Sequence, residues 1–224
     1  MSSDDKATST PASTSGGASR DAVDIWSRRK RNQVGSVEEI RQFRAPNGDF
    51  MYRPETHSDE CLQDLLEYCR TYGLDLQPDR QEAYVMAFTK GAQPSYRRLC
   101  TPEGFFSLCR ATRMYLPGEA WIEHPPSGKT TKDMVARAYC WIAPRPGAEP
   151  RMKVGVSCKL DDYFVRQSDG APEPLWLVLA EQRLMTVARV LAAREGLADL
   201  VEPHQTIEGT LEIMHDPEVQ KKLS

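Results

Sequence analysis

Residues 134–160, MVARAYCWIAPRPGAEPRMKVGVSCKL, contain two alternating runs separated by a loop. In 151–160 every even position is apolar, whereas the odd positions carry Arg, Lys, Gly or Ser. In 134–142 apolar even positions alternate in the same way with odd ones that include Arg, Tyr and Trp. A period of two is typical of half-buried strands, because successive side chains point to opposite faces. With three prolines and a glycine at 143–150, the sequence predicts an antiparallel hairpin.

The predicted outer face of this hairpin mixes cations with aromatic rings. Arg137, Lys153 and Lys159 share it with Tyr139 and Trp141. Cations can neutralise a phosphate backbone while ring faces stack on bases, and this combination is typical of surfaces that bind single-stranded nucleic acid. The alternative is an ordinary solvated face, since antiparallel sheets commonly face water on one side.

Length and composition indicate one globular domain with tails. The chain has 224 residues, of which 40% are hydrophobic and 27% charged. No apolar run approaches the ~20 residues of a membrane helix, and residues 1–17 lack the features of a signal peptide. We therefore expect an intracellular protein that does not enter a membrane.

The chain divides into three segments. Residues 1–45 are first rich in Ser and Thr and then basic at 28–31, and we expect a disordered tail there because few large apolar side chains are available for burial. Residues 58–200 carry the periodic patterns and form the expected core. Residues 201–224 are polar and are expected to be a C-terminal tail.

The remaining elements follow from helical stripes, short apolar runs and their caps. Ser58 is a good N-cap and Gly73 a good C-terminal residue for a helix between them. We further expect strands at 83–88, 96–100 and 120–123, and helices at 102–111 and 175–195, the last ended by Gly196. The expected fold class is α+β, with a small antiparallel sheet and a long hairpin packed against several helices.

Several classes of chemistry lack their sequence signals. The six cysteines contain no Cys-x-x-Cys pair, and the four histidines have no ligand spacing. Gly128-Lys129-Thr130 lacks the preceding glycine of a phosphate-binding loop, because position 123 is Glu. No nucleophile elbow is present either. We therefore expect no metal, no cofactor, no catalytic residue and no enzymatic activity.

The order of short motifs resembles the phage single-strand annealing proteins of the RecT and Red beta family. The resemblance covers about 59–200. It rests on Gly73-Leu74-Asp75, Glu82-Ala83-Tyr84, Glu103-Gly104-Phe105, the hairpin followed by Asp161-Asp162-Tyr163, and Trp176 followed by Ala188-Arg189. Glu103 stands where the family usually has Asp, and Glu181 and Gln182 stand where family members are often basic.

The resemblance implies a protein that binds single-stranded DNA and anneals complementary strands without ATP during homologous recombination. It also implies self-association into a ring or filament in the bacterial cytoplasm, and a 5′–3′ exonuclease and the host single-strand-binding protein as partners. Together with the basic face, it indicates backbone contacts by a set of cations and one tyrosine: Arg137, Lys153, Lys159, Arg189, Arg97, Arg98, Arg151 and Tyr139.

Two other functions remain open at this point. A Ser/Thr-rich tail and a basic run on an otherwise acidic chain also suit a viral capsid or nucleoprotein that coats single-stranded nucleic acid without sequence specificity. The net charge of −3 keeps a protein-interaction module without nucleic acid in view. An annealing assay without ATP separates the three.

Overall fold

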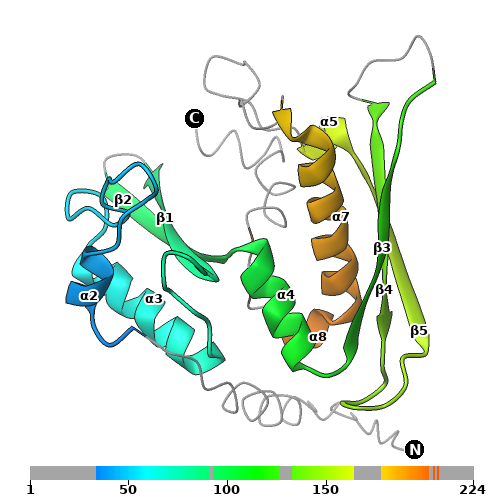
Figure 1. The fold of residues 1–224 in the computed structure, drawn as a ribbon, viewed down its shortest axis with the longest axis horizontal. Coiled ribbons are helices and arrows are strands. Elements are labelled where there is room, and N and C mark those ends of the chain that lie inside the picture. Colours follow the sequence, from blue (N-terminus) through cyan, green and yellow to red (C-terminus); the bar gives the residue numbers. More distant parts are fainter. Residues whose placement is uncertain are drawn as a thin grey trace, which may run out of the picture.

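The computed structural model describes residues 34–90, 93–126, 133–163, 178–201, 204 and 206, and these form a mixed α and β fold (Figure 1). Six helices and two small antiparallel sheets lie within them, which confirms the expected fold class. None of these helices is long and apolar enough to cross a membrane.

The sequence places 34–45 in a tail, but the structure folds this segment onto the core. Helix α2 (Val37–Arg41) lies there, and Val34, Ile40 and Phe43 are buried. These three apolar side chains offset the cost of ordering the segment by burial. Residues 1–33 lie outside the described residues.

The first sheet is a hairpin covered by one helix. Helix α3 (Asp59–Tyr72) begins where Ser58 Oγ accepts a hydrogen bond from the Cys61 N–H, and it ends at Gly73, whose φ is 62°. Its apolar side packs on strand β1 (Ala83–Lys90), which pairs with β2 (Gln93–Cys100). Both strands are longer than expected.

Helix α4 (Pro102–Ala111) connects the two sheets. Thr101 caps it by accepting a hydrogen bond from the Gly104 N–H at 3.1 Å. A side chain at Gly104 would collide with the backbone of Glu82, so the helix can begin against the turn before β1 only with a glycine there. Phe105, Leu108 and Cys109 of this helix are fully buried.

The second sheet contains the predicted hairpin and one further strand. Its order is β3 (Tyr115–Glu123), β4 (Val135–Ile142) and β5 (Met152–Lys159), all antiparallel. The hairpin is confirmed, whereas the expected strand at 120–123 covers only the second half of β3. Pro117 and Gly118 disfavour a strand prediction, but β3 is an edge strand with an irregular register between Pro117 and Ala120, where both residues are tolerated.

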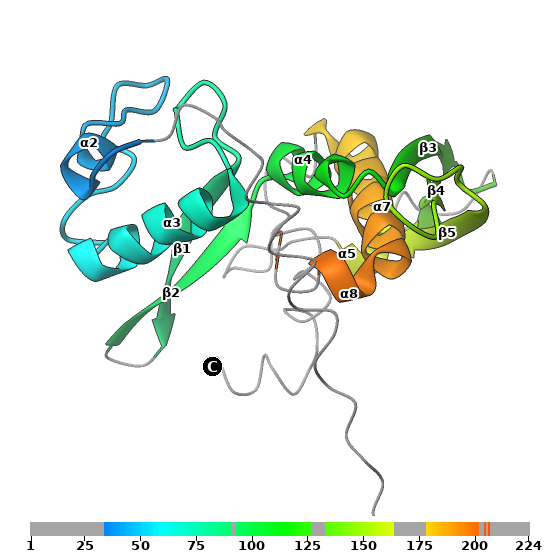
Figure 2. The ribbon, with the colours of Figure 1, turned by 90° about the horizontal axis from the view of Figure 1, so that it is seen from below.

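Helix α7 (Ala180–Gly196) covers one face of the second sheet (Figures 1 and 2). Its Leu184, Val187 and Ala188 form a buried cluster with Ala136 and Ala138 of β4. The expected start of the helix at residue 175 lies outside the described residues, as do 176 and 177. Two single-turn helices flank it, α5 (Leu160–Tyr163) and α8 (Ala198–Val201).

Three described residues of the expected C-terminal tail belong to the core: Val201 at the end of α8, His204 and Thr206. His204 and Thr206 are fully buried, and Thr206 forms a parallel bridge with Cys100 at the end of β2. His204 Nδ1 is hydrogen-bonded with Tyr68 Oη at 2.7 Å, and Arg194 Nη2 donates to the His204 carbonyl at 2.6 Å. The segment around His204 therefore connects α3, which covers the first sheet, with α7, which covers the second.

Candidate nucleic-acid interface

The face of the second sheet that is turned away from α7 is here called the outer face. Strand β4 alternates strictly, because Ala136, Ala138 and Cys140 are buried whereas Arg137 is exposed and Tyr139 and Trp141 are half-buried. The predicted assignment of faces in the hairpin is therefore confirmed. In β5 Cys158 is buried on the helix side, but Met152 at the strand's start is 51% exposed, because it lies at the end of the sheet.

Three aromatic rings cross the outer face and are here called the aromatic stripe. They belong to Trp121, Tyr139 and Trp141, with centroids 6.4 Å apart between the first two and 6.3 Å between the last two. Both pairs meet edge to face, an arrangement that aromatic quadrupoles favour. Trp121 is 42% exposed, so one of the largest apolar side chains of the protein faces solvent.

A glycine allows the middle ring of the stripe to lie where it does. Gly118, in the irregular part of β3, faces Tyr139 so closely that a Cβ atom would collide with the Tyr139 carbonyl oxygen and ring. On the other side of Tyr139, its cross-strand partner is Gly155. Tyr139 thus has a glycine close to it on each of the two neighbouring strands.

Lys153 lies over the stripe. Its cross-strand partner is Trp141, but the Nζ atom lies 3.8 Å from the Tyr139 ring centroid and 5.7 Å from that of Trp141. Cations above ring faces are attracted by the ring quadrupole. The structure therefore brings together two of the predicted residues, Lys153 and Tyr139.

The other two outer-face cations are paired with carboxylates. Arg137 Nε lies 2.7 Å from Glu123 Oε1, and this hydrogen bond holds the pKa of Glu123 below its usual value. Lys159 Nζ lies 3.1 Å from Asp133 Oδ1, and this hydrogen bond raises the pKa of the lysine. A phosphate that approaches either cation therefore competes with an acidic neighbour.

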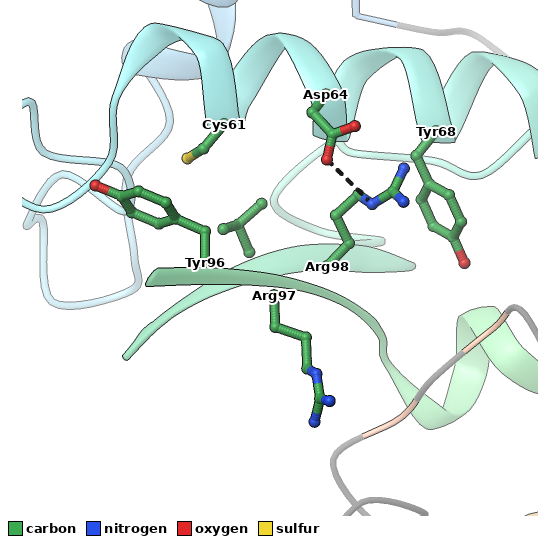
Figure 3. A pocket seen from close by; sticks show the side chains of 7 residues that line it. Cys61, Asp64, Tyr68, Tyr96, Arg97 and Arg98 are labelled. Atoms are coloured by element: carbon green, nitrogen blue, oxygen red, sulfur yellow. Dashed lines mark ion pairs between the residues drawn. The ribbon is translucent and has the colours of Figure 1, made fainter. Parts of the chain in front are cut away.

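Arg97 and Arg98 lie on β2, in the first sheet, and not on the outer face. Arg98 Nε lies 3.1 Å from Asp64 Oδ2, and the guanidinium lies 5.0 Å from the Tyr68 ring centroid. Both arginines line a cavity of about 340 Å³ beside α3. Figure 3 shows that Arg98 points toward Asp64, whereas Arg97 points to the opposite side of the strand.

Arg189 and Arg151 complete the predicted set. Arg189 is exposed on α7, the helix that covers the inner face, and its charge acts on Tyr115. Burial raises the pKa of Tyr115, and the positive charges of Arg110 and Arg189 oppose that rise. Arg151 is exposed at the start of β5, where its N–H donates to the Ile142 carbonyl at 3.0 Å. The outer face thus unites Arg137, Tyr139, Lys153 and Lys159, with Arg151 at its end.

Trp121 is the aromatic residue of this face that sequence reasoning missed as a candidate. The available signal was the period of two in 119–123, which places Trp121 on the face opposite to that of Ala120 and Ile122. In the structure these two residues are more buried than Trp121. Trp141 was placed on the outer face but not among the binding residues. The two acidic partners, Glu123 and Asp133, could not be paired with their cations without the sheet register.

In the described ranges no group of three or more His, Cys, Asp or Glu side chains is arranged to hold a metal ion. All six cysteines are free thiols, and all except the half-buried Cys61 are buried. Neither protein-family models nor curated proteins show a match to this chain.

Proposed function

We propose that this protein binds single-stranded DNA on the outer face of the second sheet and anneals complementary strands without ATP. The observation that carries the proposal is the aromatic stripe, Trp121, Tyr139 and Trp141, with the Lys153 ammonium lying over it. The order of motifs that resembles the RecT and Red beta family supports the same function.

The stripe supplies the attraction to bases. Stacking of a base on an aromatic side chain contributes about 1–3 kcal/mol and tolerates every sequence, because each base has a π-face. Trp121 and Trp141 flank Tyr139, so the stripe offers rings in adjacent rows of the sheet. A strand that crosses the sheet can place successive bases against them.

The charges of the outer face favour a DNA strand that is bound but can still be exchanged for another. Lys153 adds a cation beside the rings, whereas Arg137 and Lys159 each share their charge with a carboxylate. Few phosphate contacts contribute only a modest affinity, because the electrostatic contribution grows with the number of phosphates that are neutralised. A base that is stacked by one face keeps its hydrogen-bonding edge available, which is the condition that pairing with a second strand requires.

The test compares oligothymidine binding by the wild type and by a variant with Trp121→Ala and Trp141→Ala, using fluorescence anisotropy at low salt. Phe50→Ala is the matched control, since Phe50 is also 42% exposed and has the Arg44 guanidinium 3.8 Å from its ring centroid. We expect the control to bind as the wild type does.

The double variant should lose at least tenfold in affinity, because two stacking contacts contribute about 1–3 kcal/mol each. Equal affinity of the double variant and the wild type would remove the stripe from the site. Binding without faster annealing of complementary oligonucleotides would instead support a structural coat on single-stranded nucleic acid.

A further inference from the structure

A second basic surface lies at one end of the second sheet, next to the aromatic stripe. The connection from α4 to β3 meets the loop between β4 and β5 there (Figure 1). The Ala143 N–H donates to the Met114 carbonyl at 2.8 Å, and the Gly147 N–H donates to the Arg113 carbonyl at 3.0 Å. The two connections are therefore held together by backbone hydrogen bonds.

Three arginines project from this junction, Arg113, Arg145 and Arg151, and are here called the arginine end. All three are exposed. Arg113 has a φ of 57°, the only left-handed residue other than glycine in the described part of the chain. The Arg113 Nη2 atom lies 4.0 Å from the position that a Cβ atom on Gly147 would occupy, which is an ordinary van der Waals distance. The guanidinium of Arg113 therefore lies beside the loop. Glycine would suit this backbone conformation better than arginine does.

The cations of the arginine end differ from Arg137 and Lys159 of the outer face in their acidic neighbours. Among the described residues no carboxylate lies within ion-pair distance of Arg113, Arg145 or Arg151. On the outer face both Arg137 and Lys159 have such a partner. Cations without a carboxylate partner gain most from a phosphate, because no existing ion pair has to be broken.

The arginine end continues the stripe in space. Lys153 is paired across the strands with Trp141, and Arg151, the residue before β5, precedes it by two positions. The Arg151 N–H donates to the carbonyl of Ile142, the last residue of β4 and the chain neighbour of Trp141, so Arg151 lies where the strand that carries the stripe enters the loop. Planar guanidinium groups match phosphate geometry with two parallel hydrogen bonds.

We propose that the arginine end binds the phosphate backbone of the same DNA strand whose bases stack on the aromatic stripe. This inference rests on the proposed function and adds the direction in which the strand leaves the outer face. The three exposed arginines supply cations at the end of the sheet, over which the chain of phosphates would run.

The test measures oligothymidine affinity over a series of salt concentrations for the wild type and for a variant with Arg113→Gly and Arg145→Gln. Glycine accepts the left-handed backbone at position 113, so the fold is preserved while the guanidinium is removed. The control carries Arg53→Gln and Arg80→Gln, which remove two exposed arginines beside Asp49 and Asp79.

The slope of log affinity against log salt should become shallower by about 1.4 in the double variant, since each lost phosphate contact on a single strand is worth about 0.7. The control should keep the wild-type slope. A wild type that binds, with an unchanged slope in the double variant, would overturn this inference and leave the proposed function standing. A wild type that binds no oligothymidine would overturn both.

Discussion

The Lys153 ammonium lies over Tyr139, its diagonal neighbour, at 3.8 Å from the ring centroid, although its direct cross-strand partner is Trp141. The reason lies in the next row of the sheet. Tyr139 is paired there with Gly155, which has no side chain to keep the lysine away. The register of β4 and β5 thus places a cation over the middle of the aromatic stripe, where bases are proposed to stack.

Lys153→Gln should weaken single-stranded DNA binding and leave the fold intact. The substitution removes one cation from the proposed path, so the salt slope should become shallower by about 0.7. Stability should change by no more than about 1 kcal/mol, since an exposed cation–π contact contributes about 0.5–1 kcal/mol. Anisotropy titrations and urea unfolding measure the two effects, and Lys153→Arg should restore the slope. A slope that stays at the wild-type value in Lys153→Gln would remove this lysine from the path.

Gly118→Ala and Gly155→Ala should differ in stability although both residues flank Tyr139. A Cβ at 118 collides with the Tyr139 ring and carbonyl, whereas a Cβ at 155 meets its nearest atoms at ordinary distances of 3.6 and 3.7 Å. We expect Gly118→Ala to lower the free energy of unfolding by about 1–3 kcal/mol, as forced insertion of a methyl group does. Chemical denaturation compares them, and equal free energies would mean that Tyr139 does not lie over Gly118.

Glu123→Gln should tighten DNA binding, because it releases Arg137 from its carboxylate partner. The pH dependence has a definite sign. Glu123 has a lowered pKa in the folded state, so its ion pair stabilises the fold above the usual carboxyl pKa and is lost as pH falls through the lower, folded value. As the pH falls, the DNA affinity of the wild type should therefore rise relative to that of Glu123→Gln, because protonation of Glu123 releases Arg137. Parallel affinity curves over pH would show that Arg137 is outside the site.

Tyr68→Phe should destabilise the contact between the two sheets. The hydroxyl is buried between His204 Nδ1 at 2.7 Å and Cys100 Sγ at 3.1 Å, and its loss leaves these groups without that partner. We expect the free energy of unfolding to fall by about 1–3 kcal/mol. Tyr139→Phe serves as the control, because Tyr139 is half-buried at the surface of the sheet. Equal free energies for the two variants would show that the buried network contributes nothing to stability.

Local patterns predicted the elements of this fold well, and long-range arrangement less so. The alternation in the hairpin and the helix ends at Ser58 and Gly73 depend on features that act over a few residues, and the structure confirms them. The first half of β3 was missed because Pro117 and Gly118 are tolerated only at the edge of a sheet. Edge position is a property of the assembled sheet and cannot be detected within one segment.

The candidate site was predicted in part for the same reason. Arg97 and Arg98 are close to the hairpin in sequence, but they lie on a separate sheet, and no local signal separates two small sheets from one. Residues distant in sequence also decide which cations are paired, since Arg137 finds Glu123 on the neighbouring strand. His204 is polar and follows the last helix, and only its contact with Tyr68 shows that it is part of the core.

The central claim is tested most directly by mixing two complementary oligonucleotides, labelled as a fluorescence donor and acceptor, with the protein in the absence of ATP. We predict that the wild type forms the duplex well above the spontaneous rate, and that the variant with Trp121→Ala and Trp141→Ala does not. Phe50→Ala should match the wild type. A wild-type rate equal to the spontaneous rate, or an equal acceleration by the double tryptophan variant, would contradict annealing on the outer face.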